Sequence, residues 1–236
     1  MRIGLFSDCE GDASELEATL GELRTYAPDA IVLAGDILRC PYSPDPPAET
    51  IAQLRASSVL AVPGNNDRYL IDWGTSRWEH TLWMRLRRSD PLTFTLEDVR
   101  ASVAQITPED LAWLRALPEE LTLDGGRGGR VYVCHGMPGN PWNSIWPSSP
   151  MFDANVSEYD RQASLRLLVA AGAGLVLCGH IGEPREVHDE LPDGRPLRII
   201  RAGGHRPPGH AAYAVLTQRG SAWDVEWGSV EVPRHR

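Results

Sequence analysis

The chain contains no lysine at all, and all 23 of its basic side chains belong to arginine. A mechanism that needs a Schiff-base lysine or the phosphate-binding lysine of a P-loop is therefore excluded. Cysteine is also scarce: the four present form no C-x-x-C pair, and a chain of 236 residues does not need disulfide bonds for stability. No apolar run approaches the roughly 20 residues that span a bilayer, so no membrane contact is expected.

The charge balance limits the partners further. Acidic residues exceed basic ones, and the formal net charge is −9 at pH 7. A protein that grips long nucleic acid needs clustered arginine and lysine, so no such partner is expected. The first residues enter an apolar strand directly, without the basic and apolar regions of a signal peptide. Together with the unpaired cysteines, this predicts a location in the reducing cytoplasm.

Alternating strand and helix patterns fill the first quarter of the chain. Apolar runs predict strands at 2–7, 30–34 and 59–62, and helices are expected between them at 12–26 and 47–56. These two βαβ-type units favour a parallel sheet with right-handed crossovers. The alternation of strands and helices stops at about 72–118. There Trp73, Trp78 and Trp83 and the segment ITPEDLAWLRALP predict a helical insertion with Thr107 as an N-cap.

The second half reads as a mixture of strands and one long helix. We expect a hairpin with the turn DGGRGGR, a helix at 157–171, a strand ending in GLVLCGH, and short strands up to residue 232. Parallel units followed by antiparallel strands indicate two mixed sheets packed face to face with helices outside. The expected fold class is α/β, as a four-layer α-β-β-α sandwich in a single domain over 1–236.

One chemical pattern recurs at the ends of five apolar strands. The strands IGLFSD, AIVLAGD, VLAVPGNND, VYVCH and LVLCGH end at Asp8, Asp36, Asn65 to Asp67, His135 and His180, respectively. Ligands of open α/β sheets bind at the carboxyl ends of the strands, so these side chains are expected to converge.

A set of two aspartates, an amide oxygen and two imidazoles suits Mn, Fe, Zn or Ni. A carboxylate shared by two such ions would let them clamp a phosphate and activate a water molecule. Each residue taken alone also has a plainer reading. A strand-end aspartate is often a turn or helix cap, and a single histidine is often only hydrogen-bonded. Their joint occurrence after successive strands favours a metal site.

The ordered set resembles the calcineurin-like metallophosphoesterases, whose signature is D-x-H, G-D, G-N-H-D, a strand-end histidine and G-H-x-H. Within that superfamily it is most similar to the small prokaryotic phosphodiesterase-like members, because His135 begins an H-G-x-P loop. The resemblance implies a metal-dependent phosphoesterase, acting on a phosphodiester or on a small nucleotide-type substrate. It also implies two divalent metal ions as cofactors.

Carried over position by position, the resemblance implies two ligand sets that share Asp36. The second metal would take Asn65, His135 and His180 in addition. The first metal would take Asp8 and Glu10, where Glu10 replaces the histidine of D-x-H, and would lack the last histidine of G-H-x-H, where Gly182 stands. The added carboxylate favours a harder ion, Mn above all. Water, Glu183, a phosphate oxygen or His205 could fill the vacant position.

The third motif departs from the family pattern as well, because Asn66 replaces the histidine of G-N-H-D. That histidine is expected to orient the phosphate and protonate the leaving group, and asparagine can do only the former. Asp67 is interpreted as a group that orients a neighbour. Two hypotheses remain open: a working phosphoesterase with Asp36, Asn65, Asn66 and Asp67 in its catalytic set, or a degenerate relative that binds a metal or a phosphorylated ligand without efficient turnover.

Four further residues have weaker claims as substrate-binding groups. Arg39 and Arg68 follow the second and third motifs and could contact a phosphate, or could be ordinary surface arginines. Trp142, with Trp146, could form an apolar wall for a nucleobase or could simply pack its loop, and His205 is the fourth candidate. The cysteines near the motifs are read as small buried apolar residues. Strand alternation would place Cys178 on the same face as His180.

Overall fold

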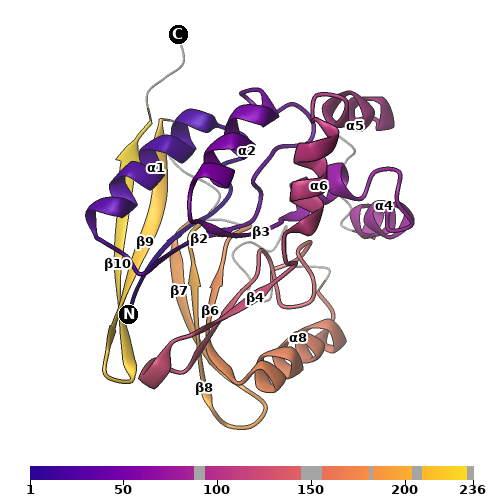
Figure 1. Cartoon of the computed structure of the whole chain (residues 1–236). Helices are drawn as coiled ribbons and strands as arrows, with labels where there is room; N and C mark the ends of the chain where they lie inside the picture. Colours follow the sequence, from indigo (N-terminus) through magenta and orange to yellow (C-terminus); the bar gives the residue numbers. More distant parts are fainter. Residues whose placement is uncertain (88–93, 145–155, 181–182, 204–208, 233–236) are drawn as a thin grey trace.

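The computed structural model describes residues 1–87, 94–144, 156–180, 183–203 and 209–232 of the chain. Ten strands form two mixed sheets of five strands each (Figure 1). The first sheet has the order β10-β9-β1-β2-β3, with bounds Ala222–Glu231, His210–Arg219, Arg2–Phe6, Ala30–Ala34 and Leu60–Val62. The second has the order β4-β5-β6-β8-β7, with bounds Leu121–Asp124, Arg130–Val133, Ala173–Cys178, Pro196–Arg201 and Arg185–Glu190.

Each sheet combines three parallel strands with two strands that pair in the antiparallel sense. In the first sheet β1, β2 and β3 run parallel, while β9 is antiparallel to both β1 and β10. In the second, β5, β6 and β8 run parallel, and β4 and β7 close the two edges in the antiparallel sense. The carboxyl ends of β1, β2, β3, β5 and β6 are the five strand ends that the sequence singled out.

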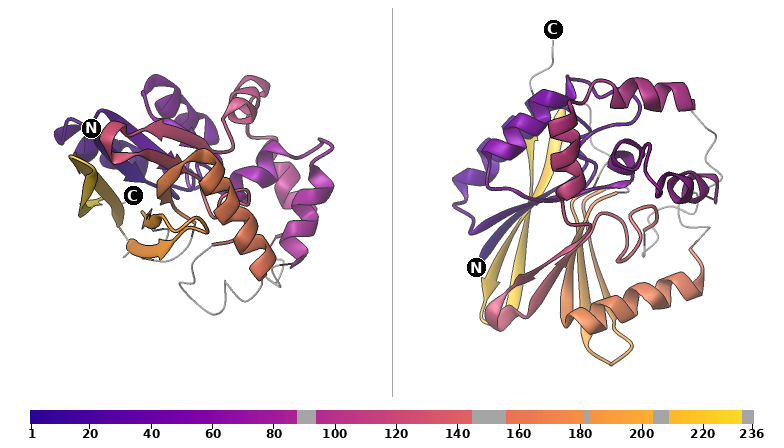
Figure 2. Two further views of the ribbon diagram at one scale, coloured as in Figure 1. Left: turned by 90° about the horizontal axis from the view of Figure 1, so that it is seen from below. Right: turned by 45° about the vertical axis from the view of Figure 1, so that its right-hand side comes forward.

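Period-two alternation along the strands divides the apolar side chains among three cores. Ile3, Leu5, Val133 and Leu177 lie in the core between the two sheets. Alternate residues face outward, and those of the first sheet pack against the helices α1 (Ala13–Thr25) and α2 (Pro47–Ala56). Those of the second sheet pack against α8 (Glu158–Ala171). The four layers are the predicted α-β-β-α sandwich (Figure 2).

Local signals in the sequence explain where the helices begin. The Oδ1 atom of Asp12 accepts a hydrogen bond from the Glu15 N–H at 2.8 Å and caps α1. The predicted cap Thr107 accepts from the Asp110 N–H at 3.1 Å, and α6 (Pro108–Ala116) follows with proline at its first position. The short 3-10 turn η1 (Gly126–Gly128) lies in the β4–β5 hairpin, as the glycine-rich turn predicted.

The stretch expected to be a helical insertion contains α4 (Trp78–Arg87), α5 (Leu96–Val103) and α6. The helical run begins earlier than expected, with α3 (Asn65–Ile71) directly after β3. Buried residues of these helices, among them Val99 and Leu114, belong to the same core as Phe6 and Leu20. In the described part of the chain, no helix has the length and apolar character that crossing a membrane requires.

Candidate metal centre

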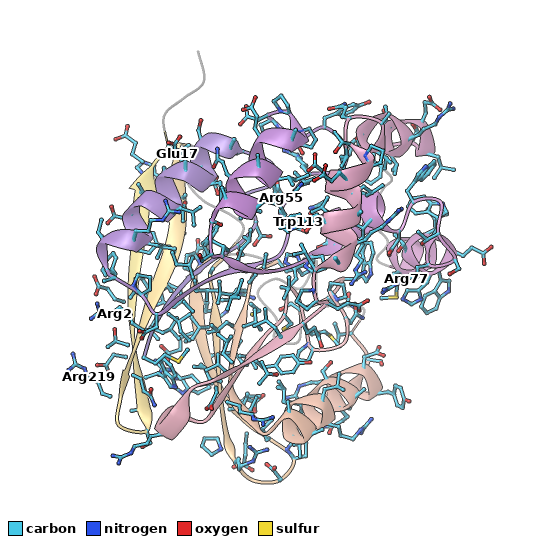
Figure 3. All side chains as sticks on the ribbon, viewed as in Figure 1. Arg2, Glu17, Arg55, Arg77, Trp113 and Arg219 are labelled. Atoms are coloured by element: carbon cyan, nitrogen blue, oxygen red, sulfur yellow. The ribbon has the colours of Figure 1, made fainter. Side chains whose placement is uncertain are left out.

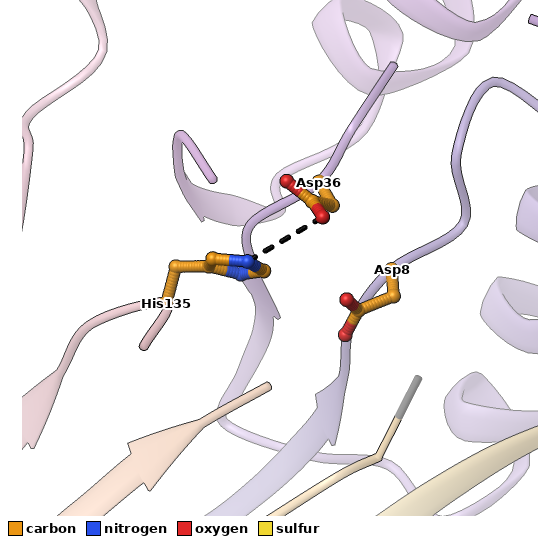
Figure 4. Close-up of side chains that lie close together, drawn as sticks. All are labelled: Asp8, Asp36 and His135. Carbon is orange, nitrogen blue, oxygen red and sulfur yellow. Dashed lines mark ion pairs between the residues drawn. The ribbon is translucent and has the colours of Figure 1, made fainter. Parts of the chain in front are cut away.

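Three of the predicted strand-end residues meet where the two sheets adjoin. Asp8 follows β1, Asp36 follows β2, and His135 follows β5 of the other sheet. All three are buried, and each contributes a ligand atom that lies within 4.8 Å of the others (Figure 4). The neighbours in this cluster come from strands that are parallel within each sheet, as expected for a site at the carboxyl edge.

The loops after β1 and β2 run side by side and hold the two aspartates in place. The Asp8 N–H donates to the Gly35 carbonyl at 2.9 Å, and the Glu10 N–H donates to the Asp36 carbonyl at 3.0 Å. Asp8 and Asp36 have φ values of 59° and 50°, in the left-handed region that non-glycine residues rarely adopt. Backbone strain of this kind concentrates at functional sites, where the surrounding contacts sustain it.

Two motif glycines are needed because the backbone comes very close to the cluster. A Cβ added at Gly64 would lie 2.1 Å from Asp36 Oδ1 and 2.3 Å from the Asp36 backbone nitrogen. A Cβ at Gly35 would lie 2.4 Å from His135 Nδ1, and Gly35 also has a φ of 85°. The glycines of G-D and G-N-N-D therefore make room for the site residues.

The ring of His135 is oriented by the first sheet. Its Nδ1 atom lies 2.7 Å from the Ala34 carbonyl, an arrangement in which Nδ1–H donates and Nε2 faces the cluster. Around Nε2 lie Asn65 Oδ1 at 3.0 Å, His180 Nδ1 at 3.1 Å and Asp36 Oδ2 at 3.5 Å. The backbone N–H of His180 also donates to Asp8 Oδ2 at 3.1 Å.

This arrangement gathers several lone pairs around one point. Carboxylate and amide oxygens are acceptors only, and Nε2 is an acceptor in the tautomer fixed by Ala34. Such atoms repel one another unless a proton or a cation lies among them. Two carboxylates, an amide oxygen and two imidazoles are a donor set that suits a divalent transition-metal ion, so the residues present fit such a group.

The pKa shifts of His135 and Asp36 also indicate that positive charge stabilises the cluster. Burial alone would lower the pKa of His135, but the charge of Asp36 and a hydrogen bond to it raise the pKa to about 9. Burial alone would raise the pKa of Asp36, but His135 and the hydrogen bonds from Asn66 outweigh it and lower the pKa. A proton on His135 thus supplies the positive charge that a metal ion would otherwise bring.

Asn66 holds both oxygens of Asp36. Its backbone N–H donates to Asp36 Oδ1 at 2.8 Å, and its side-chain amide donates to Oδ2 at 2.8 Å. The position that carries histidine in the family pattern therefore fixes a metal-ligand candidate in this chain. An amide has a second N–H, and the residue is half-buried, so that N–H could meet a substrate oxygen.

Asp67 bonds to backbone groups of the loops that carry the site. Its Oδ2 atom accepts hydrogen bonds from the backbone N–H groups of Gly64 at 2.8 Å and Ile37 at 3.0 Å, and Oδ1 accepts from Leu38 at 2.9 Å. The carboxylate thus joins the loops after β2 and β3. Burial and the charge of Asp36 raise its pKa to about 7 against these three hydrogen bonds.

Glu10 and Arg39 pair with each other at the rim. Glu10 Oε2 lies 3.7 Å from Arg39 Nη1, and both side chains are substantially exposed. The structure does not bring Glu10 into the cluster of Asp8, Asp36 and His135. Arg39 follows Asp36 by three residues in the loop after β2, and it stays a substrate-binding candidate.

The other two substrate-binding candidates in the described residues are buried. Arg68 forms ion pairs with Asp72 at 3.7 Å and Glu119 at 3.2 Å. The ring of Trp142 packs edge-on against Tyr69, with 5.1 Å between the ring centroids. Both residues therefore have structural partners, and both also line the same pocket.

The remaining residues singled out in the sequence are three in unassigned segments and the four cysteines. Gly182, His205 and Trp146 lie outside the described residues. All four cysteines are buried and none forms a disulfide bond; for Cys9, Cys134 and Cys178 the burial was predicted. Burial raises the pKa of Cys178 to about 12. The expectation that Cys178 shares a face with His180 is wrong. His180 has a φ of 76°, which turns it toward His135, whereas Cys178 packs in the core beside α8.

Three residues of this region were not predicted from the sequence: Ala34, Asp72 and Arg77. The Ala34 carbonyl orients His135, and a backbone atom gives no sequence signal. Asp72 and Arg77 extend the ion pairs of Arg68 near the pocket. The four-residue spacing of Arg68 and Asp72 on one helix was a readable signal for at least one of these pairs.

Comparisons with known proteins identify the family, and solved structures share the fold. The family model described as the calcineurin-like phosphoesterase superfamily domain matches residues 1–221. A metallophosphoesterase structure from Sphaerobacter thermophilus is 22% identical, with a TM-score of 0.60, over 98% of this chain and 88% of that chain. A dimetal phosphatase from Danio rerio is 14% identical, with a TM-score of 0.50, over 99% of both chains. An archaeal phosphodiesterase is 12% identical, with a TM-score of 0.49, over 96% of this chain and 99% of that chain. No curated protein matches.

Proposed function

The chain belongs to the calcineurin-like phosphoesterase superfamily, and from that membership we propose that it is a metal-dependent phosphoesterase acting on a phosphodiester or on a small nucleotide-type substrate. The observation that carries the proposal is the convergence of Asp8, Asp36 and His135, whose ligand atoms lie within 4.8 Å of one another. Asn65 and His180 add an amide oxygen and an imidazole nitrogen beside His135 Nε2.

These residues would hold two divalent ions, with Asp36 shared between them. Mn is favoured over Fe, Zn or Ni because oxygen donors predominate once Glu10 is included, which requires Glu10 to turn from Arg39 toward the cluster. When bound, such ions supply a nucleophilic water at neutral pH and neutralise the charge of the phosphate. The net charge of −9 supports a small phosphorylated substrate rather than long nucleic acid.

The residues of the chain itself have distinct tasks in this proposal. His135 keeps Nε2 directed at the cluster because Nδ1–H is bound to Ala34. Asn66 fixes Asp36 with two hydrogen bonds and offers its remaining N–H to a phosphate oxygen. Because an amide cannot release a proton at neutral pH, substrates with good leaving groups should be hydrolysed best.

The test uses bis-p-nitrophenyl phosphate with metal-stripped protein and added Mn. We expect turnover that rises with Mn in two phases, and loss of turnover in the near-isosteric variant Asp36→Asn. The matched control is Glu17→Gln, a carboxylate-to-amide change on the exposed face of α1 (Figure 3), which should leave turnover unchanged. Equal activity in Asp36→Asn and wild type would refute the proposed site.

A second candidate function rests on the partners of Asn66 and Glu10, which are Asp36 and Arg39. Asn66 supplies no acid, and Glu10 is paired with Arg39 rather than with the cluster. A chain built in this way could bind a metal ion or a phosphorylated ligand without efficient turnover. Folded protein that binds Mn in calorimetry but shows no hydrolysis at any Mn concentration would favour this candidate.

A further inference from the structure

A pocket of about 280 Å³ is lined in part by residues that follow two of the site residues, Asn65 and His135, closely along the chain. One wall is α3, which begins at Asn65 and carries Arg68 about 4.5 Å further along the helix axis. A second wall is the loop after His135, which reaches the pocket with residues 139–143. The helices α4 and α8, at the right of Figure 1, contribute the remaining sides. Because Arg68 lines the pocket, the pocket begins about one helical turn from Asn65, whose Oδ1 atom lies 3.0 Å from His135 Nε2.

The charges of the pocket do not favour a second phosphate. Arg68 lies between the carboxylates of Asp72 and Glu119 at 3.7 and 3.2 Å. Arg77, at the start of α4 (Figure 3), pairs with the same two acids. Asp160 adds a further carboxylate to the lining, so the acids outnumber the arginines. An anion would meet these carboxylates, whereas a neutral group with polar edges can bond to guanidinium and carboxylate alike.

The pocket also offers flat aromatic surface. Trp83 is 50% exposed, which is a large exposure for a tryptophan, and it lines the pocket together with His80. The two rings lie with centroids 6.0 Å apart and planes tilted by 32°. Trp142 lines the pocket from the loop after β5. Aromatic side chains of this kind stack on planar heterocycles, whatever the base.

We propose that this pocket binds the nucleobase of the substrate, with Trp83 as the stacking residue, while the phosphate lies at the cluster of Asp8, Asp36 and His135. The inference rests on the proposed phosphoesterase function, and it narrows the substrate class to nucleotides or nucleotide diesters. The volume is slightly below the roughly 300–1,000 Å³ of sites for drug-sized molecules, as suits a single base with part of its sugar.

The test measures binding of a nucleoside without phosphate, so that it does not depend on catalysis. Labelled adenosine is dialysed to equilibrium against the metal-free full-length chain, with ribose and benzyl alcohol as unlabelled competitors. Because loss of a base–aromatic stack costs roughly tenfold in affinity, Trp83→Ala should weaken adenosine binding by about that factor. Trp227→Ala, which removes a partly exposed tryptophan on β10, is the matched control and should bind adenosine as wild type does.

The outcomes separate the subsite from the proposed function. Adenosine binding that weakens in Trp83→Ala alone supports the subsite, whether or not the chain hydrolyses bis-p-nitrophenyl phosphate. No adenosine binding at millimolar concentration, in protein whose circular dichroism shows it folded, overturns the inference even if hydrolysis is found. Equal binding by Trp83→Ala and Trp227→Ala overturns it too, as does benzyl alcohol competing as well as unlabelled adenosine.

Discussion

The substitution Gly64→Ala should displace Asp36, and the backbone torsions of residue 64 are not the reason. Gly64 has φ −99° and ψ −171°, which any residue adopts, so the effect of a methyl group is purely steric. The new Cβ would lie 2.1 Å from Asp36 Oδ1, whereas ordinary contact begins at 3.4 Å. Asp36 must therefore move by more than about 1 Å, and its backbone nitrogen, 2.3 Å from the Cβ, prevents a simple rotation of the side chain.

The displacement of Asp36 should lower both the stability of the fold and the rate of turnover. Overpacking of this kind costs about 1–3 kcal/mol, and for a chain of this length it should lower the Tm by roughly 3–10 °C. A misplacement of about 1 Å at a reacting centre costs roughly 100-fold in rate, so turnover of bis-p-nitrophenyl phosphate should fall at least that far. Mn affinity, measured by calorimetry, should fall as well because Asp36 is the shared ligand.

Gly21→Ala provides the control for the Gly64 variant. Gly21 lies within α1, and an added Cβ there meets no atom within 4 Å. Alanine favours a helix interior over glycine by about 1 kcal/mol, so this variant should gain stability and keep wild-type metal affinity. If Gly64→Ala unfolds at the wild-type temperature and binds Mn as wild type does, the close packing described at Asp36 is wrong.

Three further predictions concern charge, metal and a helix cap. In the metal-free chain the pKa of His135 is raised from about 6.5 to about 9, so its stabilising effect, about 3 kcal/mol, is complete below pH 6.5 and is lost as the pH rises through 9. Urea unfolding across this range should show the loss in wild type and not in His135→Gln. Excess Mn should raise the Tm of wild type and not that of Asp36→Asn, because only an ion bound to the native state stabilises it; an equal rise in both would refute the metal site. Thr107→Ala should cost about 1 kcal/mol because the cap of α6 is lost, whereas Thr107→Ser should cost little; equal losses in urea unfolding would contradict the cap.

Much of the fold could be predicted from period and position alone. The strand at 30–34 and the helix at 47–56 have the predicted bounds, because a buried apolar run and a proline at a helix start are local signals. The approach of Asp8 to Asp36 was also predictable, since the neighbouring parallel strands β1 and β2 bring their carboxyl ends to one edge. His135 reaches them from the other sheet, and that contact depends on how the two sheets pack.

Side-chain direction was harder to predict than position. Glu10 faces Arg39 rather than the cluster, and the pairing of two long exposed side chains leaves no trace in motif spacing. Asn66 reaches Asp36 only because the loops after β2 and β3 meet in space, and that contact is tertiary. His180 departs from strand alternation because its left-handed backbone redirects the side chain, and nothing in GLVLCGH signals that torsion.

The position of β1 within its sheet has a consequence for synthesis on the ribosome. One edge of β1 pairs with β2, which follows shortly after it, but the other edge pairs with β9, which is translated only after the whole second sheet. Until β9 emerges, the apolar strand beginning RIGLF has an open edge, and such edges recruit strands from other chains. Pauses in translation before residue 210 should therefore increase aggregation of the nascent chain, whereas pauses after β10 should not.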